Sequence, residues 1–356
     1  MTSAHDALSF LHGPSMANRL MLAPLTNSQS HADGTLSDAE INWLLMRARA
    51  GFGLTMTAAA QVTPIGQGFP GQLAAYDDIH LPGLRRLAAD INAAGSVSYV
   101  QLHHAGNRAP ADLIGGQPVS SSDDPSTGAR AMSNDEVRAT IDAFVSAAQR
   151  CEAAGFHGVE LHGAHGYLIG QFLSPEINRR TDEYGGSLEN RARFLMETVD
   201  GVRAACGDDF ALAVRLSPER FGMRLPEVMD VYGWLVDTGK VDLIDMSLWD
   251  VNKEPEDDAF KGRSLCELFA GLPRGDVRLG VAGKIHEPAD VQRVLDADVD
   301  VAVLGRVAIL HHDYPQRIND PDFTPRRAPV SREVLAAEGL SEPFIDYMAN
   351  VHKFVA

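Results

Sequence analysis

Short apolar runs alternate with longer amphipathic stretches along almost the whole chain. The short runs predict buried strands of a parallel sheet, and the amphipathic stretches predict the helices that connect them. The expected strands cover residues 20–23, 53–56, 97–101, 158–162, 210–215, 241–246, 279–282 and 299–304. The expected helices cover residues 37–50, 84–94, 133–155, 187–205, 225–238, 262–271 and 287–296. Ser37 and Glu40 form a capping-box pattern, and Ser133 opens another capped helix.

About eight strand-then-helix units predict an α/β fold closed into a (β/α)8 TIM barrel, with an open doubly wound sheet as the competing architecture. Polar residues or glycines finish or follow several of the strands: Thr26, Gln101, His162, Arg215, Gly283 and Gly305. In a barrel these strand ends converge on the face that holds the active site. No repeat or linker divides the chain. We therefore expect residues 1–356 to form a single domain, with a C-terminal extension at about 307–356 packed on the barrel.

Composition excludes several classes of function. The 356 residues carry 31 Lys and Arg against 48 Asp and Glu, a formal net charge of −17. This acidic balance argues against nucleic acid and anionic lipid as partners. The three cysteines are too far apart for a disulfide scaffold, a cysteine zinc site or an iron–sulfur cluster. Because neither a signal peptide nor an apolar membrane span is visible, we expect a cytoplasmic protein.

The segment from Glu160 to Tyr167 places two imidazoles three residues apart at a strand end. His162 and His165 could form a metal site, but the sequence nominates no further ligand. They could instead be two N–H donors that stabilise a developing enolate. Tyr167 would then be a plausible acid, because a tyrosine's ordinary pKa of about 10 keeps it protonated at neutral pH. A purely structural role for both histidines is the remaining interpretation.

A second candidate constellation is Gln101 with Arg215. Arg215 lies inside the apolar run 213–216, where a buried guanidinium needs an acidic partner or a ligand. A salt bridge inside the barrel is one interpretation of this residue. An amide and a guanidinium would also suit the planar, electron-rich edge of a ligand.

Two late turns each place a cation after glycine: Gly283-Lys284 and Gly305-Arg306. Barrels often bind phosphate with the loops after strands seven and eight, and glycine lets the backbone approach an anion closely. No G-x-G-x-x-G sequence follows a strand and opens a helix, so no Rossmann domain is expected. A phosphorylated cofactor would therefore be held by the barrel itself.

These residues resemble the Old Yellow Enzyme family of FMN-dependent ene-reductases, over most of the chain from Asn18 to about Ala308. The segments that carry the resemblance are 18–26, 33–34, 101–106, 160–169, 172–175, 178–191, 214–215 and 304–306. The most specific of them is the long block 178–191, NRRTDEYGGSLENR. The resemblance implies an FMN-binding barrel that takes hydride from NADH or NADPH.

The resemblance also implies roles for individual residues. The residues expected to line the flavin ring are Pro24, Leu25, Thr26 and Ala59, with the Thr26 hydroxyl near the flavin O4. The pyrimidine edge would be bound by Gln101 and Arg215, with Arg215 near N1. The residues expected to hold the FMN phosphate are Gly283, Lys284, Gly305 and Arg306.

By the same resemblance, the substrate is a small activated alkene. His162 and His165 would bind its carbonyl or nitro oxygen, and Tyr167 would protonate Cα. NADH or NADPH would use the same site in turn, which predicts ping-pong kinetics. The choice between the two donors and the physiological alkene stay open, because loops such as 106–132 and 247–262 shape the pocket.

The chain departs from part of the family in ways that leave alternatives open. Thr26 stands where one branch has cysteine, and Ser28 stands where that branch has an aromatic residue. That branch's C-terminal arginine–aromatic tail has no match in 344–356, so the chain could be a monomer or a homo-oligomer. An FMN barrel acting on nitrate esters or small amines is the alternative function. From other classes, a metal-dependent barrel lyase or hydrolase using the histidine pair, and a barrel that only binds ligands, also stay open.

Overall fold

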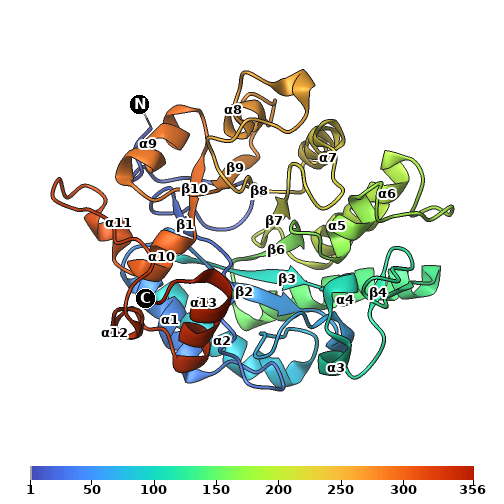
Figure 1. Cartoon of the computed structure of the whole chain (residues 1–356), viewed down its shortest axis with the longest axis horizontal. Helices are drawn as coiled ribbons and strands as arrows, with labels where there is room; N and C mark the ends of the chain where they lie inside the picture. The colour runs from blue at the N-terminus through green and yellow to red at the C-terminus, as the bar shows by residue number, and fades with distance from the viewer. Residues whose placement is uncertain (1) are drawn as a thin grey trace.

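Eight parallel strands close into a barrel in the computed structural model, which describes residues 2–356 (Figure 1). The barrel strands are β1 Leu20–Leu22, β2 Leu54–Gln61, β3 Val97–His103, β6 Gly158–Gly163, β7 Ala211–Leu216, β8 Leu243–Ser247, β9 Arg278–Ala282 and β10 Val301–Leu304. Each strand pairs with the next along the chain, and β1 pairs with both β2 and β10 to close the ring. The predicted (β/α)8 barrel is confirmed.

A helix follows each barrel strand before the next strand begins. These helices are α1 Asp38–Arg49, α2 Leu81–Ala93, α4 Asn134–Ala154, α6 Leu188–Ala205, α7 Leu225–Asp237, α8 Leu265–Ala270, α9 Pro288–Asp296 and, after β10, α10 Arg306–Leu310. Pro82 lies in the first turn of α2, which begins three residues before the prediction. α8 begins later than predicted, because Ser264 and Glu267 form a capping box at its start.

The two predicted caps have different outcomes. Ser133 and Glu136 exchange both hydrogen bonds of a capping box. The Ser37 hydroxyl accepts from the Glu40 backbone N–H at 3.1 Å, but the Glu40 side chain does not return the bond. Its fully buried carboxylate instead accepts from Asn27 Nδ2 at 3.0 Å and from the Ser30 hydroxyl. The capping-box prediction is therefore wrong for Glu40, which fastens the loop after β1 to α1.

The predicted loop 106–132 contains short elements that its polar composition concealed. They are the 3₁₀ helix η3 Gly106–Arg108, α3 Ala111–Ile114 and the strands β4 Val119–Ser120 and β5 Arg130–Ala131. β4 and β5 pair in parallel. Further short helices are η1 Pro64–Gly66, η2 Asp78–His80, η4 Asp258–Phe260 and α5 Leu168–Leu173. Runs this short carry too little periodicity to be recognised in a sequence.

The barrel interior is apolar at one end and polar at the other. At the end where the strands begin, a bridge between Leu8 and Met16 covers a cluster that includes Met56 and Tyr99. Towards the ends of the strands, Gln101, Glu160, Arg215 and Asp245 are buried inside the barrel. The apolar end supplies stability, and the polar end is the face on which barrel enzymes build their sites.

The residues after β10 also form α11 Tyr314–Arg317, α12 Arg332–Ala337 and α13 Glu342–His352. α13, at the red end of the chain, lies beside α1 (Figure 1). Ser341 binds Gln29 Oε1 through its N–H at 3.1 Å and its hydroxyl at 2.6 Å, and the rings of Trp43 and Phe344 meet edge to face at 5.4 Å. The last helix is thus fastened to the loop after β1. Within residues 2–356, no helix has the length and apolarity needed to cross a membrane.

Candidate active site

Four buried side chains from neighbouring strands form a polar layer inside the barrel. Gln101 and Glu160 are register partners, and Gln101 Nε2 donates to Glu160 Oε1 at 2.7 Å. Arg215 and Asp245 are also register partners, with Arg215 Nε 3.1 Å from Asp245 Oδ2. Glu160 Oε2 is buried without a hydrogen-bond partner, and the contact of Arg215 Nε with Asp245 is an ion pair without hydrogen-bond geometry. Arg215 therefore has an acidic partner and still leaves hydrogen-bonding capacity for a ligand.

Both carboxyl groups of this layer have a pKa above the ordinary value. Burial, reinforced by Asp245, raises the pKa of Glu160 to about 8 against the opposing effects of Arg215 and Gln101. Burial also raises the pKa of Asp245, and Arg215 opposes the shift. Two carboxylates share one guanidinium here, so full ionisation would leave an excess negative charge out of water.

We expect Glu160→Gln to change how stability depends on pH. A raised pKa means that the folded protein holds this proton more tightly than the unfolded chain, so native stability falls as pH rises from the ordinary 4.5 to about 8. The variant lacks this loss, so its stability relative to the native protein should rise across that interval and level off above it. Urea unfolding of both proteins at saturating FMN, at several pH values, measures the difference. Parallel pH profiles would contradict the expectation.

Three aromatic side chains converge just beyond the end of β6. His162 lies on β6, His165 in the following turn, and Tyr167 directly before α5. The ring centre of His162 is 5.1 Å from that of His165 and 5.1 Å from that of Tyr167. His165 adopts a left-handed backbone conformation (φ 62°). Its N–H donates to Ser217 Oγ at 3.0 Å, and its Nε2 lies 2.8 Å from Ser247 Oγ.

Both histidines of this group are held neutral. Burial lowers the pKa of His165 to about 3, and the nearby cations Arg215, Arg108 and Arg220 add to the shift. Burial and the neighbouring His165 also lower the pKa of His162 well below its ordinary value. At neutral pH each ring is therefore an imidazole with one N–H donor, not an imidazolium.

The sequence indicated no role for several residues that the fold brings next to His162, His165 and Tyr167. The His103 ring centre is 4.4 Å from that of Tyr167 and 5.4 Å from that of His162. Because side chains alternate along a strand, the step from Gln101 to His103 could have placed it on this face. Arg108 Nη1 donates to the His165 carbonyl at 2.5 Å, and its guanidinium lies 4.9 Å from the Tyr167 ring centre.

The C-terminal extension adds a further unpredicted residue. Burial raises the pKa of Tyr347, on α13, while a hydrogen bond with Thr26 opposes the shift and Tyr167 adds to it. The predicted extension therefore reaches the same region as Thr26 and Tyr167. Only its length and amphipathic character could have been recognised in the sequence.

The predicted ring-lining residues come from the first two strands. Pro24, Leu25 and Thr26 follow β1 and are half-buried. Ala59 is 8% exposed and lies where the pairing of β2 with β3 changes register after Met56. A Cβ atom added at Gly305 would lie 3.7 Å from Leu25 Cδ2, so the loop after β1 lies beside the turn after β10.

The two predicted phosphate turns are neighbours, because Ala282 and Val303 are register partners at the ends of β9 and β10. A Cβ atom at Gly283 would lie 2.8 Å from the Asp250 backbone nitrogen, so this position requires glycine. Lys284 Nζ lies 3.0 Å from Asp250 Oδ2. Across residues 2–356, Arg306 enters no ion pair.

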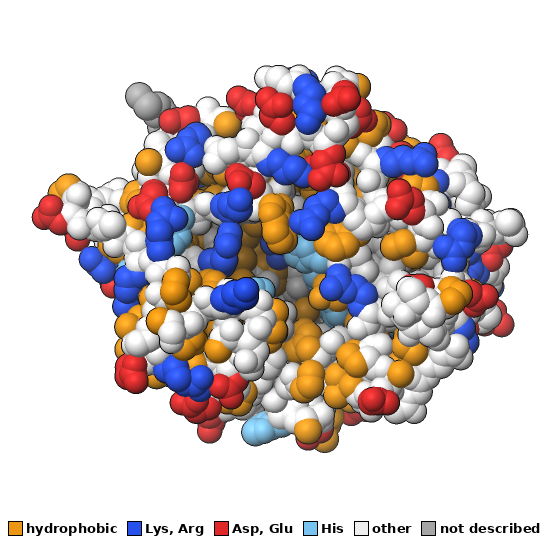
Figure 2. Space-filling model, in the orientation of Figure 1, with side chains coloured by type: hydrophobic (Ala, Val, Ile, Leu, Met, Phe, Trp, Pro, Cys, Tyr) orange, Lys and Arg blue, Asp and Glu red, His pale blue; other side chains and the backbone are white. Residues whose placement is uncertain are grey.

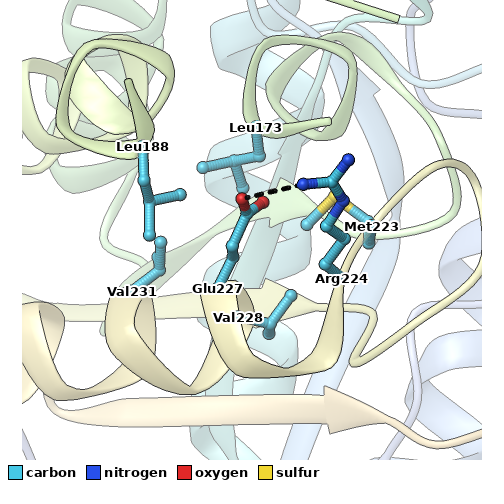
Figure 3. A pocket seen from close by; sticks show the side chains of 7 residues that line it. All are labelled: Leu173, Leu188, Met223, Arg224, Glu227, Val228 and Val231. Atoms are coloured by element: carbon cyan, nitrogen blue, oxygen red, sulfur yellow. Dashed lines mark ion pairs between the residues drawn. The ribbon is translucent and has the colours of Figure 1, made fainter. Parts of the chain in front are cut away.

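A separate hollow lies away from these groups, between α5, α6 and α7 (Figure 3). Its lining residues are Leu173, Leu188, Met223, Arg224, Glu227, Val228 and Val231. Arg224 and Glu227 form an ion pair of 3.7 Å within it. None of the predicted site residues lines this hollow.

Comparison with known proteins decides the family. Residues 12–321 match the family model described as NADH:flavin oxidoreductase / NADH oxidase family. The chain belongs to this family. Its members include the Old Yellow Enzymes, so the resemblance inferred from the sequence is confirmed. This Old Yellow Enzyme relative is an FMN-dependent oxidoreductase that uses NADH or NADPH.

Two curated relatives and one solved structure illustrate the likeness. A probable NADH-dependent flavin oxidoreductase, YqiG of Bacillus subtilis, is 36% identical over 326 residues, covering 88% of this chain and 87% of its own. The NADH oxidase of Thermoanaerobacter brockii is 32% identical over 85% of this chain, which spans only 48% of that longer protein. The Old Yellow Enzyme homologue of Zymomonas mobilis superposes with a TM-score of 0.82 at 26% identity, covering 97% of this chain and 99% of that chain.

FMN fits the residues of this Old Yellow Enzyme relative. The Arg215 guanidinium suits an electron-rich pyrimidine edge, and the glycine turns after β9 and β10 place two cations at neighbouring strand ends. No group of three or more His, Cys, Asp or Glu side chains in the described part of the chain could hold a metal ion.

Proposed function

We propose that this protein reduces the C=C bond of activated alkenes, either α,β-unsaturated carbonyl or nitro compounds, with NADH or NADPH as the hydride donor. The convergence of the His162, His165 and Tyr167 rings at the barrel mouth carries this proposal. These groups supply two hydrogen-bond donors for an oxygen and one acidic hydroxyl, which is what conjugate reduction requires in addition to a hydride.

FMN held by this barrel would supply the hydride carrier between the nicotinamide and the alkene. Gln101 and Arg215 would hold its pyrimidine edge, where Arg215 would supply positive charge. The residues that line the ring are Pro24, Leu25, Thr26 and Ala59. The residues that hold the phosphate are Gly283, Lys284, Gly305 and Arg306. Since the barrel holds the cofactor, the nicotinamide only visits the site, and no second nucleotide-binding domain is needed.

The histidine pair binds the activating oxygen of the substrate. As hydride reaches Cβ, negative charge develops on this oxygen, and N–H donors aimed at that point stabilise the transition state more than the ground state. Ser217 and Ser247 position His165, through its backbone N–H and its ring respectively. Neutral imidazoles suit this role because they stabilise charge without transferring their own proton early.

Tyr167 holds the proton that Cα requires. Its hydroxyl delivers the proton as the C=C bond is lost, and the Arg108 guanidinium over its ring stabilises the negative charge left behind. Alkene and nicotinamide occupy the same region in turn, so the kinetics are ping-pong.

Steady-state turnover tests this function. We expect the purified holoenzyme to oxidise NADH or NADPH rapidly with 2-cyclohexenone and with a nitroalkene, giving saturated products and parallel lines in double-reciprocal plots. A nitrate ester and a small amine are the comparison substrates, since an FMN barrel could also act on these. Turnover of either comparison substrate without reduction of any alkene would overturn the proposal.

The phosphate assignment predicts unequal effects of two substitutions. We expect Arg306→Ala to weaken FMN binding by about 10- to 100-fold, as for a lost charge-assisted hydrogen bond. Lys284→Ala should have a smaller effect, because Asp250 already pairs with Lys284. Fluorescence titration measures both affinities. Riboflavin, which lacks the phosphate, is the control ligand, and an equal loss of riboflavin affinity would contradict the assignment.

A further inference from the structure

Two arginines border the histidine pair. Arg108 is exposed, yet one of its nitrogens is fixed on the His165 carbonyl and its guanidinium lies over the Tyr167 ring. Arg220, in the loop after β7, is also exposed, and it contributes with Arg108 to the low pKa of His165. The arginines come from different loops, so the barrel mouth brings two guanidiniums close to one histidine.

An aromatic pair accompanies Arg220. Its guanidinium lies 4.4 Å from the Trp249 ring centre and 5.6 Å from that of Phe221. Trp249 is 63% exposed and Phe221 36% exposed, although large apolar side chains are usually buried. The Phe221 ring centre is 6.5 Å from that of His165. The exposed aromatic surface formed by Phe221 and Trp249 therefore lies next to the histidine pair.

The backbone of these loops is strained at the residues that carry these side chains. Arg220, Phe221 and Trp249 have φ values of 72°, 53° and 66°, in the left-handed region that side chains other than glycine rarely adopt. A residue in this conformation is destabilising on its own and persists only where the surrounding structure enforces it. Exposed aromatic residues held by a strained backbone beside a reaction site are typical of ligand contacts.

The nearby carboxylates form their ion pairs with lysines and not with the two arginines, although Lys253 and, to a lesser degree, Arg220 lower the pKa of Glu256. Glu219 and Glu256 both pair with Lys253, at 2.6 and 2.7 Å, and Asp250 pairs with Lys284. Within the described chain, neither Arg108 nor Arg220 forms an ion pair with a carboxylate. Lys and Arg side chains surround the central hollow in which histidines are visible (Figure 2). A protein with a net charge of −17 thus presents a cationic mouth.

We propose that Arg108 and Arg220 form an anion-binding subsite for a carboxylate or phosphate group of the alkene substrate, whose planar apolar body lies against Phe221 and Trp249. A guanidinium binds either anion through paired N–H donors, and an aromatic surface favours a flat, conjugated substrate. The inference rests on the proposed alkene reduction, and it names the substrate class as anionic conjugated alkenes. The phosphates of the nicotinamide donor have the same chemistry, so the experiment separates the two sources.

The test compares 4-carboxycinnamaldehyde with its neutral methyl ester in the oxidative half-reaction of the holoenzyme. We expect the second-order rate constant for flavin reoxidation to favour the acid by about two- to fivefold, the size of a solvent-exposed ion pair. Arg220→Gln should remove most of this preference, and Arg220→Lys should restore part of it. Arg85→Gln is the matched control, because Arg85 is exposed on α2 and its loss changes the net charge equally. Added salt should weaken the preference in the native protein.

The reductive half-reaction shows whether the bound anion belongs to the alkene substrate or to the nicotinamide donor. NADPH, NADH and 1-benzyl-1,4-dihydronicotinamide, which carries no phosphate, are compared as hydride donors. We expect Arg220→Gln to change all three rates by a similar small factor. If Arg220→Gln slows only the phosphate-bearing donors and leaves the preference for acid over ester intact, the subsite belongs to the donor and the proposal is overturned.

A binding measurement separates this inference from the proposed function. 4-Hydroxybenzoate and its methyl ester both offer a phenol oxygen to the histidine pair, and their affinities follow from the flavin absorbance without turnover. We expect tighter binding of the acid in the native protein and not in Arg220→Gln. That result without any alkene reduction would overturn the proposed function and support the subsite. Alkene reduction without preference for either acid would overturn the subsite and leave the function standing.

Discussion

Tyr167→Phe is expected to slow enone reduction by about 10²–10⁴-fold, the contribution of a positioned general acid. The substitution keeps the ring, and with it the contacts to His103 and His162. Flavin reduction by NADH or NADPH delivers no proton to carbon, so it should run at nearly the native rate. Anaerobic stopped-flow measurement of the two half-reactions separates these effects.

A nitroalkene gives the Tyr167 experiment an internal control. A nitronate is stable enough to leave the site and take its proton from water, so the variant should still reoxidise its flavin with this substrate. The enone and the nitroalkene therefore differ in their need for the hydroxyl. If Tyr167→Phe slows both half-reactions equally, Tyr167 has a structural role and the proton donor is another group.

Replacing both His162 and His165 with alanine is expected to abolish phenol binding, because a phenolate imitates the charged oxygen and needs both donors. Loss of one such donor commonly lowers the rate by about 10²–10³-fold, so the double variant should lose most alkene reduction. Flavin reduction should suffer less. Titration with 4-methoxyphenol, followed by flavin absorbance, reports binding without turnover.

Ser247→Ala is the matched control for the histidine pair. It removes a contact to His165 Nε2 at 2.8 Å and leaves both rings in place. We expect a smaller loss of phenol affinity than in either single histidine variant. Normal phenol binding by the His162→Ala, His165→Ala double variant would show that the oxygen binds elsewhere.

The barrel could be predicted from the sequence because each of its strands and long helices has a recognisable hydrophobic pattern within its own residues. Each strand is an apolar run bounded by polar positions, and each long helix is amphipathic over several turns. His162, His165 and Tyr167 were accessible for the same reason, since they lie within six residues of one another at one strand end. The short pieces in 106–132 were missed because two-residue strands have no period to recognise.

The remainder of the site depends on contacts between distant segments. Arg108, Phe221 and Trp249 come from loops after three different strands, and only closure of the barrel brings them to one mouth. Glu40 shows the same limit on a smaller scale. Its position in S-x-x-E favours a local cap, but burial and the hydrogen bonds from Asn27 and Ser30 override that preference.

Because the barrel contains a buried polar layer, FMN binding is expected to stabilise the folded protein. Glu160 Oε2 is buried without a hydrogen-bond partner, and such a group destabilises a folded protein until something satisfies it. A molecule that binds the native state and not the unfolded chain stabilises it by RT ln(1 + [L]/Kd), about 4 kcal/mol at a thousandfold excess over Kd. Protein that has lost its flavin is then easier to unfold as well as inactive. Melting temperatures of variants are consequently comparable only at equal flavin occupancy.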